Sequence, residues 1–132
     1  MTPENTKKLV SVAPSLFPGG EFYFECGDGW FDLLKECISS IDKICERENL
    51  TEVSVRQAKE KYGALRFYVY ETSYLIEDVI MEAEEKSFHT CEICGAEGRM
   101  TKECGWFCVR CEDCDLGNIA KEHNALAKLF LR

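Results

Sequence analysis

Six cysteines lie between positions 91 and 114, and four of them form two Cys-x-x-Cys pairs. Cys91 and Cys94 make the first pair, and Cys111 and Cys114 make the second pair after sixteen intervening residues. Two such pairs can supply four thiolates to one tetrahedral metal ion, because each pair comes from a single tight turn. The spacing therefore predicts a zinc site made by Cys91, Cys94, Cys111 and Cys114, with Gly95 allowing a positive φ in the first turn.

The surplus cysteines of this segment leave alternatives open. Cys104 and Cys108 exceed what one tetrahedral site needs, and a rival ligand set would pair Cys108 with Cys111 and leave Cys114 free. Four thiolates can also hold an iron–sulfur cluster. We favour the first set and zinc, because the spacing is that of a zinc ribbon and the chain has no other redox feature.

A site closed by four cysteines has no open coordination position, so this metal is expected to be structural rather than catalytic. It would fold a segment that is too small to build its own core. The chain has only two histidines, His89 and His123, and it lacks a Gly-rich phosphate loop and a GxSxG nucleophile elbow. We therefore do not expect an enzyme.

Composition bounds the class of protein. The chain has 132 residues, of which 45% are hydrophobic and 11% aromatic, so a folded core is expected. It contains no run of 18 apolar residues, so no membrane span is expected, and its first residues lack the apolar core of a signal peptide. The number of cysteines, nine, is odd, and six of them lie in one segment, which favours a reduced cytoplasmic metalloprotein over a secreted disulfide scaffold.

The charge balance argues against a nucleic-acid-binding protein. The net charge is −8, and residues 1–90 carry seventeen acids and ten bases while residues 91–132 carry seven acids and six bases. Neither part has the surplus of Lys and Arg from which phosphate-backbone binding draws most of its affinity.

Hydrophobic periodicity predicts the elements that must position the cysteines. Apolar residues recur at helical spacing over 30–48, where Cys37 and Cys45 are expected as small core residues, and over 74–88, whose other side is acidic. Further elements are expected as follows: an irregular lead-in over 1–20, a short strand over 21–26, a β-hairpin over 51–70 with an exposed loop at 57–62, and a terminal helix over 115–131. Asp28 is a candidate N-cap. The hairpin face with Arg66, Tyr68 and Tyr70 is either packed by a helix or presented to a partner, and we favour packing by a helix.

These elements predict an α+β fold, in which a small antiparallel sheet is packed by helices and followed by a C-terminal zinc ribbon with a trailing helix. The expected division is an α+β domain over 1–88 and a zinc ribbon with the terminal helix over 89–132. The two parts are expected to pack as one unit.

Three sequence blocks together resemble a known group of proteins. The first block is Cys26-Gly27-Asp28-Gly29-Trp30-Phe31-Asp32-Leu33-Leu34. The second block runs from Val55 to Val69 and contains Glu60-Lys61-Tyr62-Gly63-Ala64-Leu65-Arg66-Phe67-Tyr68. The third block begins with Ala83-Glu84-Glu85-Lys86-Ser87, continues through Cys91-Glu92-Ile93-Cys94-Gly95, and ends with Gly105-Trp106 and Cys111. This combination is similar to that of small, mostly uncharacterised bacterial and phage proteins with a zinc ribbon. Ala58 departs from the group's pattern. The resemblance implies that Cys111 and Cys114, which follow Gly105-Trp106, form the second ligand pair, and it implies no activity.

The expected function is protein binding by a small acidic zinc protein, for example an inhibitor or accessory factor encoded by a phage or mobile element. Its acidic surface would steer it to a basic partner or mimic nucleic acid. The alternative is a zinc ribbon that contacts nucleic acid through Arg99, Lys102 and Arg110, with Trp106 and Phe107 available for stacking. The partner and the oligomeric state are not predicted.

Overall fold

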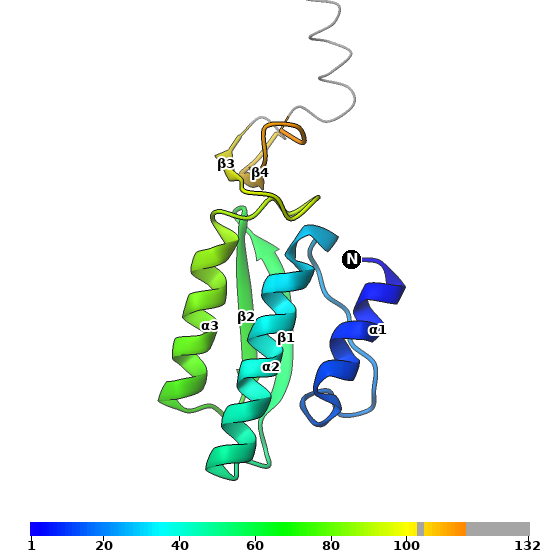
Figure 1. The fold of residues 1–132 in the computed structure, drawn as a ribbon, viewed down its shortest axis with the longest axis vertical. Helices are drawn as coiled ribbons and strands as arrows, with labels where there is room; N and C mark the ends of the chain where they lie inside the picture. The colour runs from blue at the N-terminus through cyan, green and yellow to red at the C-terminus, as the bar shows by residue number, and fades with distance from the viewer. Residues whose placement is uncertain (103–104, 116–132) are drawn as a thin grey trace, which may run out of the picture.

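The computed structural model describes residues 1–102 and 105–115, which form an α+β fold (Figure 1). In chain order its elements are α1 (Pro3–Val12), η1 (Pro14–Leu16), η2 (Asp28–Trp30), α2 (Phe31–Glu48), β1 (Ser54–Lys61), β2 (Ala64–Tyr70), α3 (Tyr74–Ser87), β3 (Arg99–Thr101) and β4 (Cys108–Arg110). β1 and β2 form one antiparallel hairpin, and β3 and β4 form a second. The expected fold class is confirmed, whereas the terminal helix expected over 115–131 lies outside the described residues apart from Asp115.

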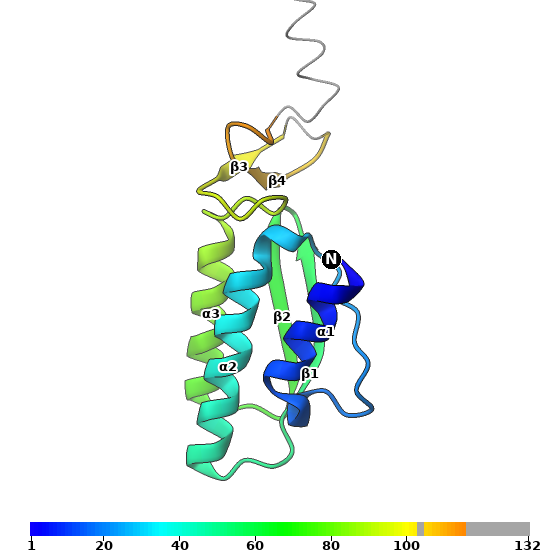
Figure 2. The same cartoon turned by 45° about the vertical axis from the view of Figure 1, so that its right-hand side comes forward.

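Helices α2 and α3 cover one face of the β1–β2 hairpin, as Figures 1 and 2 show. The apolar stripe of α2 is buried as predicted, and Ile38 and Ile41 are fully enclosed. Cys37 and Cys45 lie in this core, and burial raises the pKa of Cys37 to about 12, which keeps it protonated and unreactive. None of the described helices has the length and hydrophobicity that crossing a bilayer requires.

The prediction of an exposed loop over 57–62 is wrong, because β1 continues through these residues to Lys61. The register pairs Ala58 with Phe67 and Lys61 with Ala64, so only Tyr62 and Gly63 form the turn. Both have positive φ, 54° and 87°, as a two-residue hairpin turn of the primed type requires. The charged side chains at 59–61 suggested a loop, but they belong to a strand whose inward position, Ala58, is small and fully buried.

Both edges of the β1–β2 hairpin are occupied by other parts of the chain. On the β2 side, Leu65 N–H donates to the Ser87 hydroxyl at 2.9 Å, and Phe67 N–H donates to a Glu84 carboxylate oxygen at 3.0 Å. On the β1 side, Glu25 forms a parallel bridge with Lys59 through two backbone hydrogen bonds of 2.9 Å. The strand expected over 21–26 is therefore reduced to this single bridge.

Replacing Ser87 with alanine is expected to lower the free energy of unfolding by about 1–3 kcal/mol, because it leaves the buried Leu65 N–H without its acceptor. Ser87 is fully buried, so water cannot take the place of the hydroxyl. Urea denaturation measures the effect, and Ser40→Ala on α2, at a partly exposed site, is the matched control. Equal stability of the two variants would contradict this assignment.

The prediction of an irregular N-terminal segment over 1–20 is wrong for the first half of that segment, where α1 forms. The Thr2 hydroxyl caps this helix by accepting a hydrogen bond from Asn5 N–H at 3.2 Å, and Pro3 occupies the first turn, where it costs no hydrogen bond. Asp28 does not cap the following helix. Its Oδ1 instead accepts from Thr2 N–H at 2.9 Å and from the Asn5 side chain at 3.0 Å, and so anchors α1.

Replacing Asp28 with alanine is expected to destabilise the protein at neutral pH by about 1–2 kcal/mol through the loss of these two hydrogen bonds. The hydrogen bond from Thr2 N–H, followed by that from Asn5, lowers the pKa of Asp28 below its ordinary value of 3.8. The contribution of the Asp28 carboxylate to the free energy of unfolding is therefore present above pH 3.8 and is lost as the pH falls through the lowered pKa. Urea melts at neutral and acid pH test this, with exposed Asp78→Ala as control; a difference from wild type that is unchanged in acid would contradict it.

Candidate metal centre

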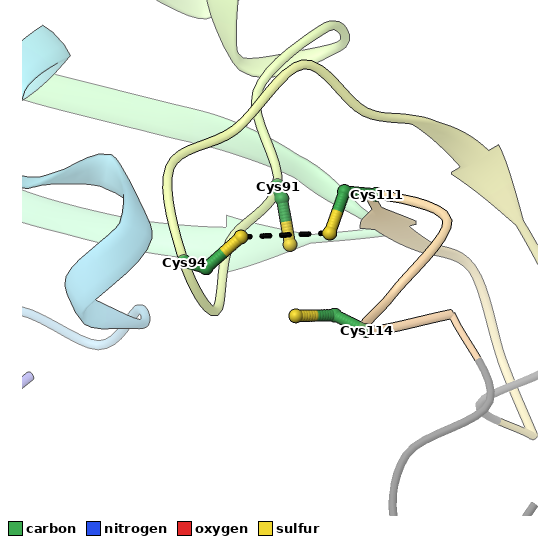
Figure 3. Close-up of side chains that lie close together, drawn as sticks. All are labelled: Cys91, Cys94, Cys111 and Cys114. Carbon is green, nitrogen blue, oxygen red and sulfur yellow. Dashed lines mark hydrogen bonds between the residues drawn. The ribbon is translucent and has the colours of Figure 1, made fainter. Parts of the chain in front are cut away.

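Four cysteine sulfurs converge beyond the end of the β1–β2 hairpin (Figure 3). The Sγ atoms of Cys91, Cys94, Cys111 and Cys114 all lie within 4.8 Å of one another, and those of Cys94 and Cys111 are 3.5 Å apart. Metal–sulfur bonds of 2.3 Å in a tetrahedron place the sulfurs about 3.8 Å apart. The four sulfurs therefore surround a space of the size that one metal ion occupies.

Two backbone turns bring these sulfurs together. In the first, Gly95 N–H donates to Cys91 O at 2.9 Å, and Gly95 has the positive φ, 82°, that the sequence suggested. In the second, Asp115 N–H donates to Cys111 O at 2.8 Å. The β3–β4 hairpin joins the two turns, and a hydrogen bond of 3.1 Å from Glu92 N–H to Val109 O ties the first turn to β4.

Cys91 is the sulfur best prepared to carry negative charge. Burial raises its pKa, but hydrogen bonds from the backbone N–H groups of Cys94, Cys111 and Ile93 outweigh burial and lower the pKa to about 7. Hydrogen bonding to the Cys111 sulfur, helped by burial, raises the pKa of Cys114 to about 12. A bound cation would replace the thiol protons, because cysteine binds a metal ion as the thiolate.

Backbone contacts dock the first cysteine turn against the loop before α2. Gly29 N–H donates to Glu92 O at 2.8 Å, and Trp30 Nε1 donates to Thr90 O at 2.9 Å. A Cβ on Gly29 would lie 2.1 Å from Cys91 O, and one on Gly27 would lie 2.3 Å from Glu92 O. Glycine is therefore required at both positions for the two backbones to approach this closely.

Glu92 links three parts of the molecule through its side chain. One carboxylate oxygen accepts from Gly27 N–H at 2.9 Å, and the other lies 3.6 Å from Arg110 Nη1 on β4. The Glu92 and Arg110 side chains are only 14% and 17% exposed, so this ion pair is screened less than one at the surface. The role of Glu92 and the docking roles of Gly27 and Gly29 could not be predicted from the sequence, because each depends on contacts between distant segments.

The tip of the β1–β2 hairpin makes a second contact with the cysteine segment. A Cβ on Gly63 would lie 2.6 Å from Met100 Sδ and 3.1 Å from Cys108 N, so the turn packs closely on β3 and β4. The Tyr62 and Trp106 rings lie beside this contact with centroids 6.2 Å apart, and they are 56% and 60% exposed.

Among the described residues, no other candidate joins the four-sulfur cluster. Cys108, the member of the rival ligand set, is buried on β4, and Cys104 lies outside the described residues. Of the expected nucleic-acid contacts, Arg99 lies 3.4 Å from Asp115 and Arg110 pairs with Glu92, so both are engaged with carboxylates. Lys102 lies over the Phe107 ring at 4.8 Å.

Comparison of the chain with protein-family models, with curated proteins and with solved structures finds no match.

Proposed function

We propose that the four-sulfur cluster holds one structural zinc ion and that the protein acts by binding another protein. The observation that carries the metal proposal is the mutual approach of four cysteine sulfurs to within 4.8 Å. Four thiolates satisfy zinc completely and leave no position for a catalytic water. The ion would stabilise a segment that has few buried side chains among its described residues, namely Cys91, Cys108, Val109 and Cys111.

The spacing of the sulfurs favours a single ion over an iron–sulfur cluster. In a four-iron cluster each cysteine binds a different iron, which holds the cysteine sulfurs farther apart than one shared ion does. The 3.5 Å approach of Cys94 to Cys111 suits ligands of one ion. All-thiolate donors in a closed tetrahedral set suit zinc among the common mononuclear metals.

Metal analysis with thiol labelling, on protein purified under reducing conditions, tests this proposal. We expect one zinc per chain, with the four cluster cysteines protected from a thiol reagent until a chelator is added. Cys26 and Cys37 should stay slow to react while the core is folded, because burial raises the pKa of each to about 12. Absence of zinc, or the absorbance of an iron–sulfur centre, would overturn the zinc assignment.

The surface of α3 supports the protein-binding part of the proposal. Tyr74, Met81 and Phe88 lie along one side of this helix at spacings of seven residues and are 92%, 64% and 37% exposed. Asp78 and Glu85 lie between them on the same side and are exposed. This α3 stripe, apolar side chains within an acidic surround, suits a partner with apolar contacts and a basic rim.

Affinity capture with matched variants tests the α3 stripe. Wild-type protein is compared with Tyr74→Ser/Met81→Ser and with Tyr23→Ser, which removes a tyrosine that is 74% exposed elsewhere on the surface. We expect a basic protein to be retained at low salt by the wild type and by Tyr23→Ser and to be lost from the double variant. Identical capture by all three proteins, or no capture, would overturn the proposal.

A more specific role as an inhibitor or accessory factor of a phage or mobile element rests on the sequence resemblance alone. Its support is the combination of the Gly27–Trp30 loop, the β1–β2 hairpin and the cysteine segment, which the fold packs against one another. Purification of the captured basic partner and an assay of its activity with and without this protein would test that role.

A further inference from the structure

The β1–β2 hairpin has a second face, opposite the one that α2 and α3 cover (Figures 1 and 2). This outer face was expected to pack under a helix, but no described helix lies over it, and Tyr70 is 57% exposed. The alternation of the strands, their register and the β-bulge between Val55 and Gln57 place several long polar and aromatic side chains there. They are Arg56, Gln57, Lys59, Lys61, Arg66, Tyr68 and Tyr70.

Positive charge is concentrated on this outer face although the chain as a whole is acidic. The strands β1 and β2 carry four bases and one acid, whereas α2 and α3 carry ten acids and four bases. The one acid, Glu60, turns its carboxylate to Gly63 N–H at 3.0 Å. Glu25, at the edge of β1, accepts a hydrogen bond from Gln57 at 3.1 Å. The net charge of −8 therefore averages over surfaces of opposite sign and does not describe this one.

Aromatic rings lie among these cations. The Arg56 guanidinium is 4.9 Å from the centroid of the Tyr68 ring and 5.9 Å from that of Tyr70. At the other end of the hairpin, the exposed rings of Tyr62 and Trp106 adjoin, and Lys61 Nζ lies 5.7 Å from the Tyr62 centroid. Rings thus lie at both ends of a strand about 20 Å long, with cations between them.

We propose that this outer face binds single-stranded nucleic acid. Lys and Arg side chains would neutralise successive phosphates, and unpaired bases would stack on the exposed rings. Exposed rings favour a single strand over a duplex, because paired bases do not offer their faces. The inference is independent of the proposed protein partner, which would use the α3 stripe on a different element.

Fluorescence anisotropy with labelled oligothymidylate and oligouridylate of about ten nucleotides tests this on the zinc-loaded full chain. The Lys59→Ala/Arg66→Ala variant removes two cations that face each other across the strands. It should bind at least tenfold more weakly and reduce the salt slope by about 1.4, because each lost phosphate contact contributes about 0.7. Tyr70→Ser should weaken binding about fivefold to a hundredfold with an unchanged salt slope.

The matched control is Lys35→Ala/Lys43→Ala, which removes two exposed lysines of α2 and should leave binding unchanged. Thermal melts establish that each variant is folded. No binding at about 50 mM salt, equal affinity for a duplex, or equal loss in the control would overturn the proposal. In a competition experiment, polyglutamate is added at the same concentration of negative charge as the oligonucleotide. Displacement of the oligonucleotide by polyglutamate would also overturn the proposal, in favour of an acidic protein ligand. A preference between the two oligonucleotides would identify DNA or RNA as the ligand.

Discussion

The Cys91→Ser protein is expected to lose the proposed zinc ion to a chelator and, with it, the folded structure of the cysteine segment, while α2 and α3 remain helical. Structural zinc sites contribute about 10–16 kcal/mol of apparent binding energy, so one of four ligands is worth about 3 kcal/mol, roughly a hundredfold in affinity. Cys91 is the fully buried sulfur whose pKa is lowered to about 7, so its loss removes the most favoured thiolate. Titration with a chromogenic chelator measures the affinity, and amide hydrogen exchange locates the unfolding.

The matched control for this experiment is Cys45→Ser. Cys45 is also buried but lies in the core of α2, away from the four-sulfur cluster. Its replacement should cost about 1 kcal/mol of global stability and leave the metal content unchanged. Full zinc occupancy in Cys91→Ser at low chelator concentration would show that Cys91 is not a ligand. Equal loss of zinc from both variants would show that metal binding reports global stability only.

The Gly29→Ala substitution is expected to separate the cysteine segment from the α+β part of the chain. The new Cβ would lie 2.1 Å from Cys91 O and within 2.6 Å of the Glu92 backbone, and neither can move aside as a side chain would. The hydrogen bond from Gly29 N–H to Glu92 O would then be lost as well. We expect destabilisation by about 3 kcal/mol or more, at the upper end for overpacking, with zinc still bound. Denaturant melts and metal content measure the two effects.

Gly20→Ala is the control for the intrinsic cost of replacing a glycine. Gly20 has a φ of 74°, and a Cβ there would meet nothing within 4 Å, so only the left-handed backbone conformation is penalised, by about 1 kcal/mol. A Gly29→Ala protein that melts like Gly20→Ala would mean that the segments are not docked as described. Loss of zinc from Gly29→Ala would mean that docking is needed to assemble the ligand set.

The elements that depend mainly on the pattern of apolar residues close together in the sequence were predicted correctly. The α2 helix follows from its apolar stripe, and Cys37 and Cys45 are core residues as that stripe required. The α1 helix was missed because Pro14, Pro18 and the Gly19-Gly20 pair suggested an irregular segment, although all of them lie after the helix. The prediction of a loop over 57–62 was wrong because Lys59 and Lys61 lie on the exposed face of a strand, while Glu60 between them turns its carboxylate to Gly63 N–H.

The four-sulfur cluster was predictable because a metal site of paired cysteines is encoded by spacing. Contacts between segments that are distant in sequence were not predictable. The Glu92 carboxylate accepts a hydrogen bond from Gly27 N–H, 65 residues earlier in the chain, and so joins the loop before α2 to β4. Nothing near Glu92 in the sequence indicates this contact. The net charge was a poor guide to nucleic-acid binding for a related reason. Composition counts residues, whereas binding depends on which of them share a face, and here the strands collect four of the bases.

The occupied edges of the β1–β2 hairpin have a consequence for how the protein behaves at high concentration. A two-stranded sheet ordinarily offers two rows of unpaired backbone groups on which another chain can add a strand, the first step toward amyloid-like assembly. Here Ser87 and Glu84 occupy the N–H groups of Leu65 and Phe67 along β2, and Glu25 takes the middle of β1. Strand addition would have to displace these partners first. The side chains of α3 therefore protect the folded chain from aggregation as well as stabilising it.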